Sequence, residues 1–197
     1  GQLKRAMEVL KANVAAIMAQ EHHAAGGDWN DLKLGAKTRG WHMQGAPAVR
    51  AYSGYGTAGV CIATRNHLRM GLPSGWSHDI SPADSPGRLT VAFVEGILRG
   101  GVLVFSAYFW HSEGLSAKNR NLLDAVGAYA KRFGGPWMLC GDFNMPPEQL
   151  AKDGAGWLVR VGGTIRAPDG PTCRSAAGGR TIDYIVFDQR VGGAVES

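Results

Sequence analysis

The segment that most constrains the fold of this chain runs from a capped helix directly into a buried strand. Ser116 is a favourable helix cap, and the residues after it are apolar at helical spacing. The helix is expected to end at Gly134, where a Gly-Gly-Pro sequence follows the last apolar residue. Residues 137–140 form a short apolar run, and Asp142 follows closely behind it. A helix that leads into a buried strand predicts a layered α/β domain.

Other apolar runs predict the remaining strands. Residues 89–95 and 102–109 are rich in β-branched and aromatic side chains, and a Gly-Gly connection favours an antiparallel pair. Helical spacing of apolar residues and three shorter apolar runs predict one more helix and three more strands, at residues 3–14 and at 14–18, 58–64 and 181–187.

Two segments rich in glycine and polar residues predict long surface loops. They are residues 24–53, which contain Trp29 and Trp41, and residues 71–87. The remaining tryptophans in loops, among them Trp76 and Trp110, are expected to pack rather than to bind bases. No repeat or linker divides the chain, so we expect a single domain over residues 1–197.

Composition limits the functional classes. The chain has 197 residues, of which 45% are hydrophobic, and a net charge of +5 that suits a polyanionic partner. No apolar run reaches the roughly 18 residues of a membrane helix, and no secretion signal is visible at the start. Cys61, Cys140 and Cys173 lie far apart without zinc-site spacing, so each is expected to be a small buried residue.

Acidic residues stand where the predicted strands meet loops. Glu21 follows the run 14–18, Asp142 follows the run 137–140, and Asp183 lies inside the run 181–187. Asn144 adds a nearby amide. Carboxylate and amide oxygens are the ligands and orienting groups that Mg²⁺ and a phosphate require.

These motifs resemble those of the endonuclease/exonuclease/phosphatase superfamily. Gln-Glu at 20–21, Gly-Asp-Phe-Asn at 141–144 and Ile-Asp-Tyr-Ile at 182–185 match in order and spacing, with support from Gly-Val at 59–60 and Ala-Tyr at 107–108. The resemblance covers nearly the whole chain. It implies the DNase I-like fold: an α/β (α+β) four-layer α/β/β/α sandwich of two mixed sheets with helices outside.

The resemblance also implies roles for individual residues. Glu21 is similar to the glutamate that binds Mg²⁺, for which Mn²⁺ is the alternative. Asp142 resembles the aspartate that orients or deprotonates the attacking water, and Asn144 the amide that contacts the scissile phosphate. Asp183 is similar to the aspartate that orients a catalytic histidine. Tyr108 resembles a phosphate-contacting tyrosine of the abasic-site endonucleases, with an ordinary strand aromatic as the equal alternative.

Three histidines near these motifs need separate interpretation. His22 and His23 follow Glu21 directly, but neighbours on an extended segment point to opposite sides, so a loop surface is favoured over a metal cluster. His111 lies three residues after Tyr108. It could contact a phosphate or act as a base, although a polar loop residue is the simpler interpretation.

Two parts of the family pattern do not occur here. The family has an asparagine on a strand before the Gln-Glu motif and an Asp-His pair after the Ile-Asp-Tyr motif, whereas no histidine follows His111. The chain begins with glycine and ends on a polar segment at 192–197. We therefore expect a domain truncated at its N-terminal and C-terminal strands and marginally stable alone; a degenerate copy is the alternative.

The expected function is metal-dependent phosphodiester hydrolysis by a DNA endonuclease of the retroelement or abasic-site branch, weak or inactive as this fragment. DNA is the expected partner, with a reverse transcriptase domain in the parent polypeptide, a monomeric state and a nuclear or cytoplasmic location. Two alternatives stay open: a phosphatase or phospholipase acting on inositol phosphates or sphingomyelin, and a non-catalytic domain that binds nucleic acid or a partner protein.

Overall fold

The computed structural model describes residues 2–10, 14–52, 54–175 and 178–192, so the polar segment 193–197 lies outside it. The helices of this part of the chain are α1 (Gln2–Val9), α2 (Gly27–Lys37), α3 (Ala117–Phe133), α4 (Pro147–Asp153) and α5 (Ala155–Val161), with a 3-10 turn at Gln189–Val191. The strands of the two main sheets are β1 (Ala16–Ala19), β2 (Trp41–Ala46), β5 (Val60–Arg65), β6 (Met70–Gly71), β7 (Leu89–Val94), β8 (Val102–Tyr108), β9 (Trp137–Asp142), β10 (Gly163–Arg166) and β13 (Asp183–Asp188). Two short hairpins pair β3 (Val49–Arg50) with β4 (Gly56–Thr57), and β11 (Cys173–Ser175) with β12 (Gly178–Arg180).

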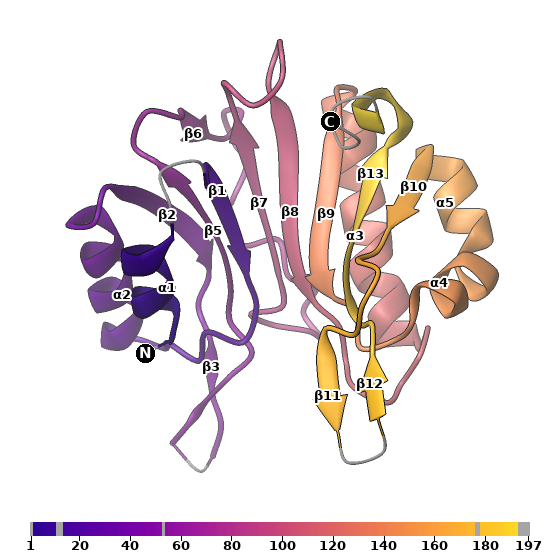
Figure 1. Ribbon diagram of the computed structural model, residues 1–197, viewed down its shortest axis with the longest axis horizontal. Helices are drawn as coiled ribbons and strands as arrows, with labels where there is room; N and C mark the ends of the chain where they lie inside the picture. Colours follow the sequence, from indigo (N-terminus) through magenta and orange to yellow (C-terminus); the bar gives the residue numbers. More distant parts are fainter. Residues whose placement is uncertain (1, 11–13, 53, 176–177, 193–197) are drawn as a thin grey trace.

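Two sheets form the centre of the molecule (Figure 1). The smaller sheet has the order β1-β5-β2, and both of its strand pairs are antiparallel. The larger sheet has the order β10-β13-β9-β8-β7-β6 and is mixed, because β8 and β9 run parallel while its other pairs are antiparallel. The parallel pair requires the crossover that α3 provides.

The sheets and helices stack as four layers. Helices α1 and α2 cover the smaller sheet, and α3, α4 and α5 cover the outer face of the larger sheet (Figure 1). Between the sheets lies an aliphatic layer that includes Ile62, Val94 and Val104. The predicted α/β/β/α sandwich is therefore confirmed.

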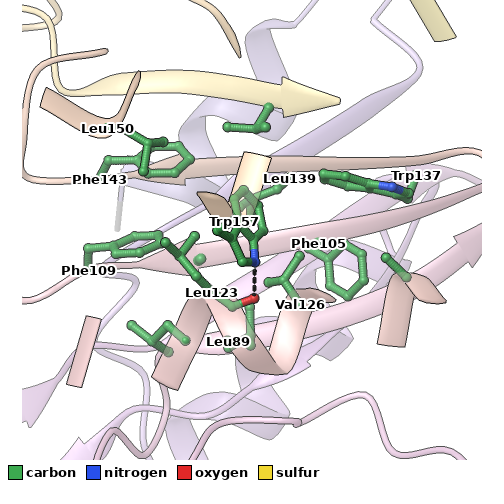
Figure 2. Close-up of a cluster of buried hydrophobic side chains, with 14 of the residues drawn as sticks. Leu89, Phe105, Phe109, Leu123, Val126, Trp137, Leu139, Phe143, Leu150 and Trp157 are labelled. Carbon is green, nitrogen blue, oxygen red and sulfur yellow. Dashed lines mark hydrogen bonds between the residues drawn. The ribbon is translucent and has the colours of Figure 1, made fainter. Parts of the chain in front are cut away.

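The largest hydrophobic core lies between the larger sheet and its helices. Figure 2 shows Phe105, Phe109 and Trp137 of this core around Trp157 of α5. The indole Nε1 of Trp157 donates a hydrogen bond to the carbonyl oxygen of Leu123 at 2.8 Å, which attaches α5 to α3. A buried indole that keeps a hydrogen-bond partner avoids the cost of desolvating its N–H group.

The predicted helix and strand of the central segment are confirmed. The Ser116 side chain caps α3 by accepting a hydrogen bond from the backbone N–H of Asn119, and Gly134 ends the helix in the left-handed conformation at φ 70°. Strand β9 follows immediately, and β7 and β8 form the predicted antiparallel pair. The helix near the N-terminus and the strands β1, β5 and β13 also lie where the apolar runs predicted them.

The prediction of a long loop over residues 24–53 was wrong. Helix α2 and strand β2 occupy most of this segment, and Trp29 and Trp41 are buried against α1. The two glycines in α2 and its many polar residues concealed the spacing of its buried face. Strand β2 alternates buried and exposed residues only over its first three positions, which is too short a signal to identify alone.

Two of the three cysteines fit the expectation of small buried residues. Cys61 and Cys140 are buried free thiols, and burial raises the pKa of each to about 12. Cys173, on the β11–β12 hairpin, is only half-buried, so the expectation was wrong there. In the described part of the chain, no helix is long and apolar enough to cross a membrane.

Close packing of β2 against β5 gives a test of the smaller sheet. A Cβ atom at Gly45 would overlap the carbonyl oxygen of Val60 and lie 2.7 Å from Cys61 Cα. We expect Gly45→Ala to lower the free energy of unfolding by roughly 1–3 kcal/mol, measured by urea denaturation. The control is Gly71→Ala on the edge strand β6, where a Cβ would have no neighbour within 4 Å. Equal stability of the two variants would contradict the observed pairing.

Candidate active site

Strand register brings three of the predicted site residues into one row. Tyr108 on β8 pairs with Asp142 on β9, and Asp142 pairs with Asp183 on β13. The three residues therefore lie side by side across neighbouring strands, at the lower end of the larger sheet in Figure 1. Two of the acidic residues that the sequence analysis singled out, Asp142 and Asp183, thus lie next to each other at one end of the larger sheet.

Glu21 reaches this row from the opposite sheet. It follows β1 directly, and the preceding residue, Gln20, donates a hydrogen bond from Nε2 to Ser106 Oγ at 2.9 Å. Ser106 in turn donates to the carbonyl oxygen of Ala19 at 3.3 Å, so β1 and β8 are tied together just before Glu21. Glu21 is also one of the groups that raise the pKa of the Tyr108 hydroxyl, so the two side chains lie near each other. The cluster is therefore assembled from both halves of the chain.

The site concentrates negative charge in a partly buried place. Burial raises the pKa of Asp142 from its ordinary 3.8 to about 6, and the charges of Asp183 and Glu21 also raise it. The backbone N–H of Asn144 and the guanidinium of Arg88 act in the opposite direction. Burial likewise raises the pKa of Tyr108 to about 12, with hydrogen bonding and charge from Glu21 adding to the effect. Tyr108 is therefore a neutral hydroxyl at pH 7.

Arg88 is a site residue that the sequence reasoning missed. Its guanidinium carbon lies 4.4 Å from the ring centre of Tyr108 and 3.7 Å from that of Trp110, and only 8% of the residue is exposed. Nη1 donates to the carbonyl oxygens of Tyr108 and Phe109 at 3.2 and 3.4 Å. Burial lowers the pKa of Arg88, whereas Tyr108 and Glu21 raise it. In the sequence, Arg88 lies between a loop and an apolar strand, where nothing distinguishes it.

The loop after Asp142 is held in a strained conformation. Asn144 has a φ of 52°, its backbone N–H donates to Asp142 Oδ1 at 2.9 Å, and its Nδ2 donates to the carbonyl oxygen of Phe109 at 2.9 Å. Beneath it, Phe143 stacks on Tyr184 with ring centres 3.9 Å apart. Left-handed backbone at a non-glycine residue is typical of sites where geometry is fixed for function.

The three histidines near the site differ in their surroundings. His111 is exposed, and its one described hydrogen-bonding partner is Ser112, at 2.6 Å from Nδ1, so nothing in the described residues joins it to the carboxylates. His23 is exposed, as expected. His22 is not a loop-surface residue, because its ring stacks on Trp29 with centres 4.8 Å apart. Burial lowers the pKa of His22 to about 4.

The carboxylates fit a magnesium ion that retains water ligands. Within the described residues no group of three or more histidines, cysteines, aspartates or glutamates is arranged as a metal-binding cluster. Mg²⁺, however, commonly uses only one or two protein carboxylates together with water and substrate phosphate. Burial raises the pKa of Asp142, and the negative charges of Asp183 and Glu21 add to that effect. A divalent cation held by Glu21 would offset this negative charge.

The family match agrees with this geometry. The model of the endonuclease/exonuclease/phosphatase family matches residues 2–195. The chain therefore belongs to this family and has its phosphoesterase fold. A search of curated proteins finds no match.

Solved structures show the same fold at low sequence identity. ANGEL2, a 2',3'-cyclic phosphatase in complex with adenosine-2',3'-vanadate, gives a TM-score of 0.66 at 12% identity over 95% of this chain and 73% of that chain. The human Nocturnin catalytic domain with bound sulfate gives a TM-score of 0.65 at 15% identity, over 96% of this chain and 75% of that chain. The endonuclease domain of TRAS1, a telomere-specific non-LTR retrotransposon, gives a TM-score of 0.52 at 13% identity, over 81% of this chain and 77% of that chain.

The raised pKa of Asp142 gives a test based on stability. Because its pKa is higher in the folded state, Asp142 costs no stability below pH 3.8 and becomes destabilising as pH rises through about 6. Asp142→Asn should therefore raise the free energy of unfolding at pH 7.5 by on the order of 1 kcal/mol, after allowance for solvent screening. The gain should vanish near pH 3.5. Urea denaturation at both pH values measures it, and a gain that does not depend on pH would contradict the shift.

Proposed function

We propose that this chain is a divalent-metal-dependent phosphodiesterase that acts on DNA as an endonuclease. The observation that carries the proposal is the meeting of Glu21 from one sheet with Tyr108, Asp142 and Asp183 from the other. Arg88 supplies positive charge beside them. Carboxylates, a neutral hydroxyl and a fixed guanidinium are the groups that hydrolysis of a phosphodiester needs.

In this proposal Asp142 is the general base. Its pKa of about 6 leaves the carboxylate ionised at pH 7 and still basic enough to accept a proton from an attacking water. Asn144 holds this carboxylate through its backbone N–H, and the nearby negative charge of Asp183 helps to keep the pKa of Asp142 raised.

In this proposal the phosphate is bound beside Tyr108 and Arg88. Tyr108 can donate its hydroxyl to a phosphoryl oxygen, and Arg88 places positive charge close to the same position. Glu21 would hold Mg²⁺, which when bound supplies Lewis-acid stabilisation of charge on the phosphoryl oxygens. The residues act chiefly by position and electrostatics, because hydrolysis by water needs no covalent bond to the protein.

Two hairpins beside the site favour a polymeric substrate. They project from the same end of the molecule as the site (Figure 1). The β3–β4 hairpin is attached next to Glu21, because Nδ1 of His23 lies 3.0 Å from the carbonyl oxygen of Gly56. Tyr52 and Tyr55 extend from it, and both side chains are largely or fully exposed. Exposed aromatic rings can stack on nucleic-acid bases.

The second hairpin, β11–β12, is attached next to Asp183. The Thr172 hydroxyl accepts hydrogen bonds from the backbone N–H groups of Ile182 and Asp183, both at 3.0 Å. Exposed Arg174 and Arg180 on this hairpin offer charge to a phosphate backbone. A small phosphomonoester would leave both hairpins without a ligand, so the arrangement favours DNA.

Variants of the carboxylates test the proposed chemistry. Glu21→Gln should weaken Mg²⁺ binding, and Asp142→Asn should lower the rate of DNA cleavage by about 100-fold or more, since the general base is lost. The assay is Mg²⁺-dependent cleavage of plasmid and abasic-site DNA, with EDTA to remove the metal. The matched control is Asp153→Asn, an exposed acid at the end of α4, which should leave cleavage unchanged.

Other results of this assay would favour the alternatives. Mg²⁺-dependent hydrolysis of inositol phosphates or sphingomyelin, without DNA cleavage, would support a phosphatase or phospholipase. Salt-dependent DNA binding without cleavage would support a non-catalytic domain. The single-domain extent of 1–197, missing strands at its ends, a reverse transcriptase partner, a monomeric state and a nuclear or cytoplasmic location stay predictions.

The exposed tyrosines provide a separate test of the substrate class. Replacing both Tyr52 and Tyr55 by Ala should raise KM for single-stranded DNA about tenfold, because stacking contributes about 1–3 kcal/mol per base. Hydrolysis of bis(p-nitrophenyl) phosphate should not change. The control is the double Tyr→Phe variant, which retains both rings. Equal KM values for the Ala and Phe variants would remove the hairpin from the DNA site.

A further inference from the structure

The segment that carries Glu21 has an unusual backbone. Glu21 and His23 both have left-handed φ values, 53° and 55°, and neither is a glycine. Such conformations are strained in residues other than glycine and persist only where surrounding contacts determine them. His22 lies between these two strained residues. Its contacts are therefore among those that can stabilise this turn.

The His22 ring has contacts on one face and at both of its nitrogen atoms. One face stacks on Trp29 of α2, with an angle of 12° between the ring planes. Nδ1 accepts a hydrogen bond from the backbone N–H of Ala24 at 3.1 Å, and Nε2 lies 3.3 Å from the carbonyl oxygen of Ala46. These contacts define one tautomer, neutral with the proton on Nε2. The backbone N–H of His22 also donates to the carbonyl oxygen of Gly59 at 3.2 Å.

The segment between β4 and β5 leaves room for the ring. A Cβ atom at Gly59 would lie 2.7 Å from His22 Nδ1, closer than real atoms approach, so a side chain there would displace the imidazole. Gly59 itself has a φ of 92°, which suits glycine. Ala58, the residue before it, pairs with the strained His23 through a backbone hydrogen bond of 3.2 Å. Residues 58–59 therefore contact both the His22 ring and the backbone of its neighbour His23.

We propose that His22 is a positioning residue that holds the strained turn at Glu21 and thereby sets the affinity of the site for a divalent cation. The inference rests on the proposed metal-dependent function. His22 contacts neither substrate nor cation in this proposal, and it acts through the backbone that presents the Glu21 carboxylate. Groups that orient a metal ligand typically change metal affinity by 10- to 100-fold when removed.

The variant that separates packing from hydrogen bonding is His22→Phe. It keeps an aromatic ring against Trp29 and removes the bonds to Ala24 and Ala46. We expect the Kd for Mn²⁺, measured by electron paramagnetic resonance without substrate, to rise about tenfold or more. The concentration of Mg²⁺ needed for half-maximal cleavage should rise equally, while kcat at saturating Mg²⁺ stays within a few-fold of the original.

Controls distinguish the possible failures. His42→Phe replaces an exposed histidine on β2 and should leave the Kd unchanged. His22→Gln provides a second variant if the Phe variant does not fold, as judged by circular dichroism. An unmodified chain that binds no Mn²⁺ would overturn the proposed function itself. Normal binding by the unmodified chain and equal binding by both folded His22 variants, with only a lower urea midpoint, would show a merely structural role and overturn this inference.

Discussion

The parallel pairing of β8 with β9 is the constraint on which the rest of the molecule depends. It makes α3 necessary as a crossover, and α3 in turn covers the face that holds the largest core. The same pairing places Tyr108 opposite Asp142, and β13 extends the row to Asp183. A shift of one residue would turn these polar side chains toward the apolar helical layer. Packing therefore fixes the chemistry of the site.

Charge at this end of the sheets is arranged for function at some cost in stability. Three carboxylates share one region, and the pKa of Asp142 is raised to about 6 by burial and by its acidic neighbours. Arg88, held between two aromatic rings, only partly offsets this charge. A protein selected for stability alone would place an amide at Asp142. Burial is the main reason that Asp142 stays basic, and its acidic neighbours add to that effect.

Much of this architecture could be predicted from short-range patterns. The capped helix, the antiparallel pair and the acidic strand ends each depend on residues close in sequence, such as Ser116, Gly134 and Asp142. Helix α2 could not be predicted in this way, because Trp29 is buried through contacts with α1 and β2 rather than through a strong local pattern. The short elements α4, α5 and β10 also carried no recognisable signal.

The same limit applies to the site. The motifs identified the acids, but Arg88 and His22 owe their positions to partners distant in sequence: Tyr108 and Trp110 for the arginine, and Trp29 for the histidine. Ring stacking and burial are properties of the folded chain. A lone arginine before a strand and a histidine pair in a loop are too common in sequences to be recognised as site residues without the folded structure.

The division of the site between two sheets gives it a mechanical sensitivity. Glu21 follows β1 of the smaller sheet, while Asp142 belongs to the larger, and Ser106 aligns them through its hydrogen bonds with Gln20 and with the carbonyl oxygen of Ala19. The rest of the inter-sheet layer is aliphatic and tolerates small sliding motions better than directional bonds do. A small displacement of one sheet along the other would separate the carboxylates and leave each sheet folded. The geometry of the site is therefore more fragile than the fold that carries it.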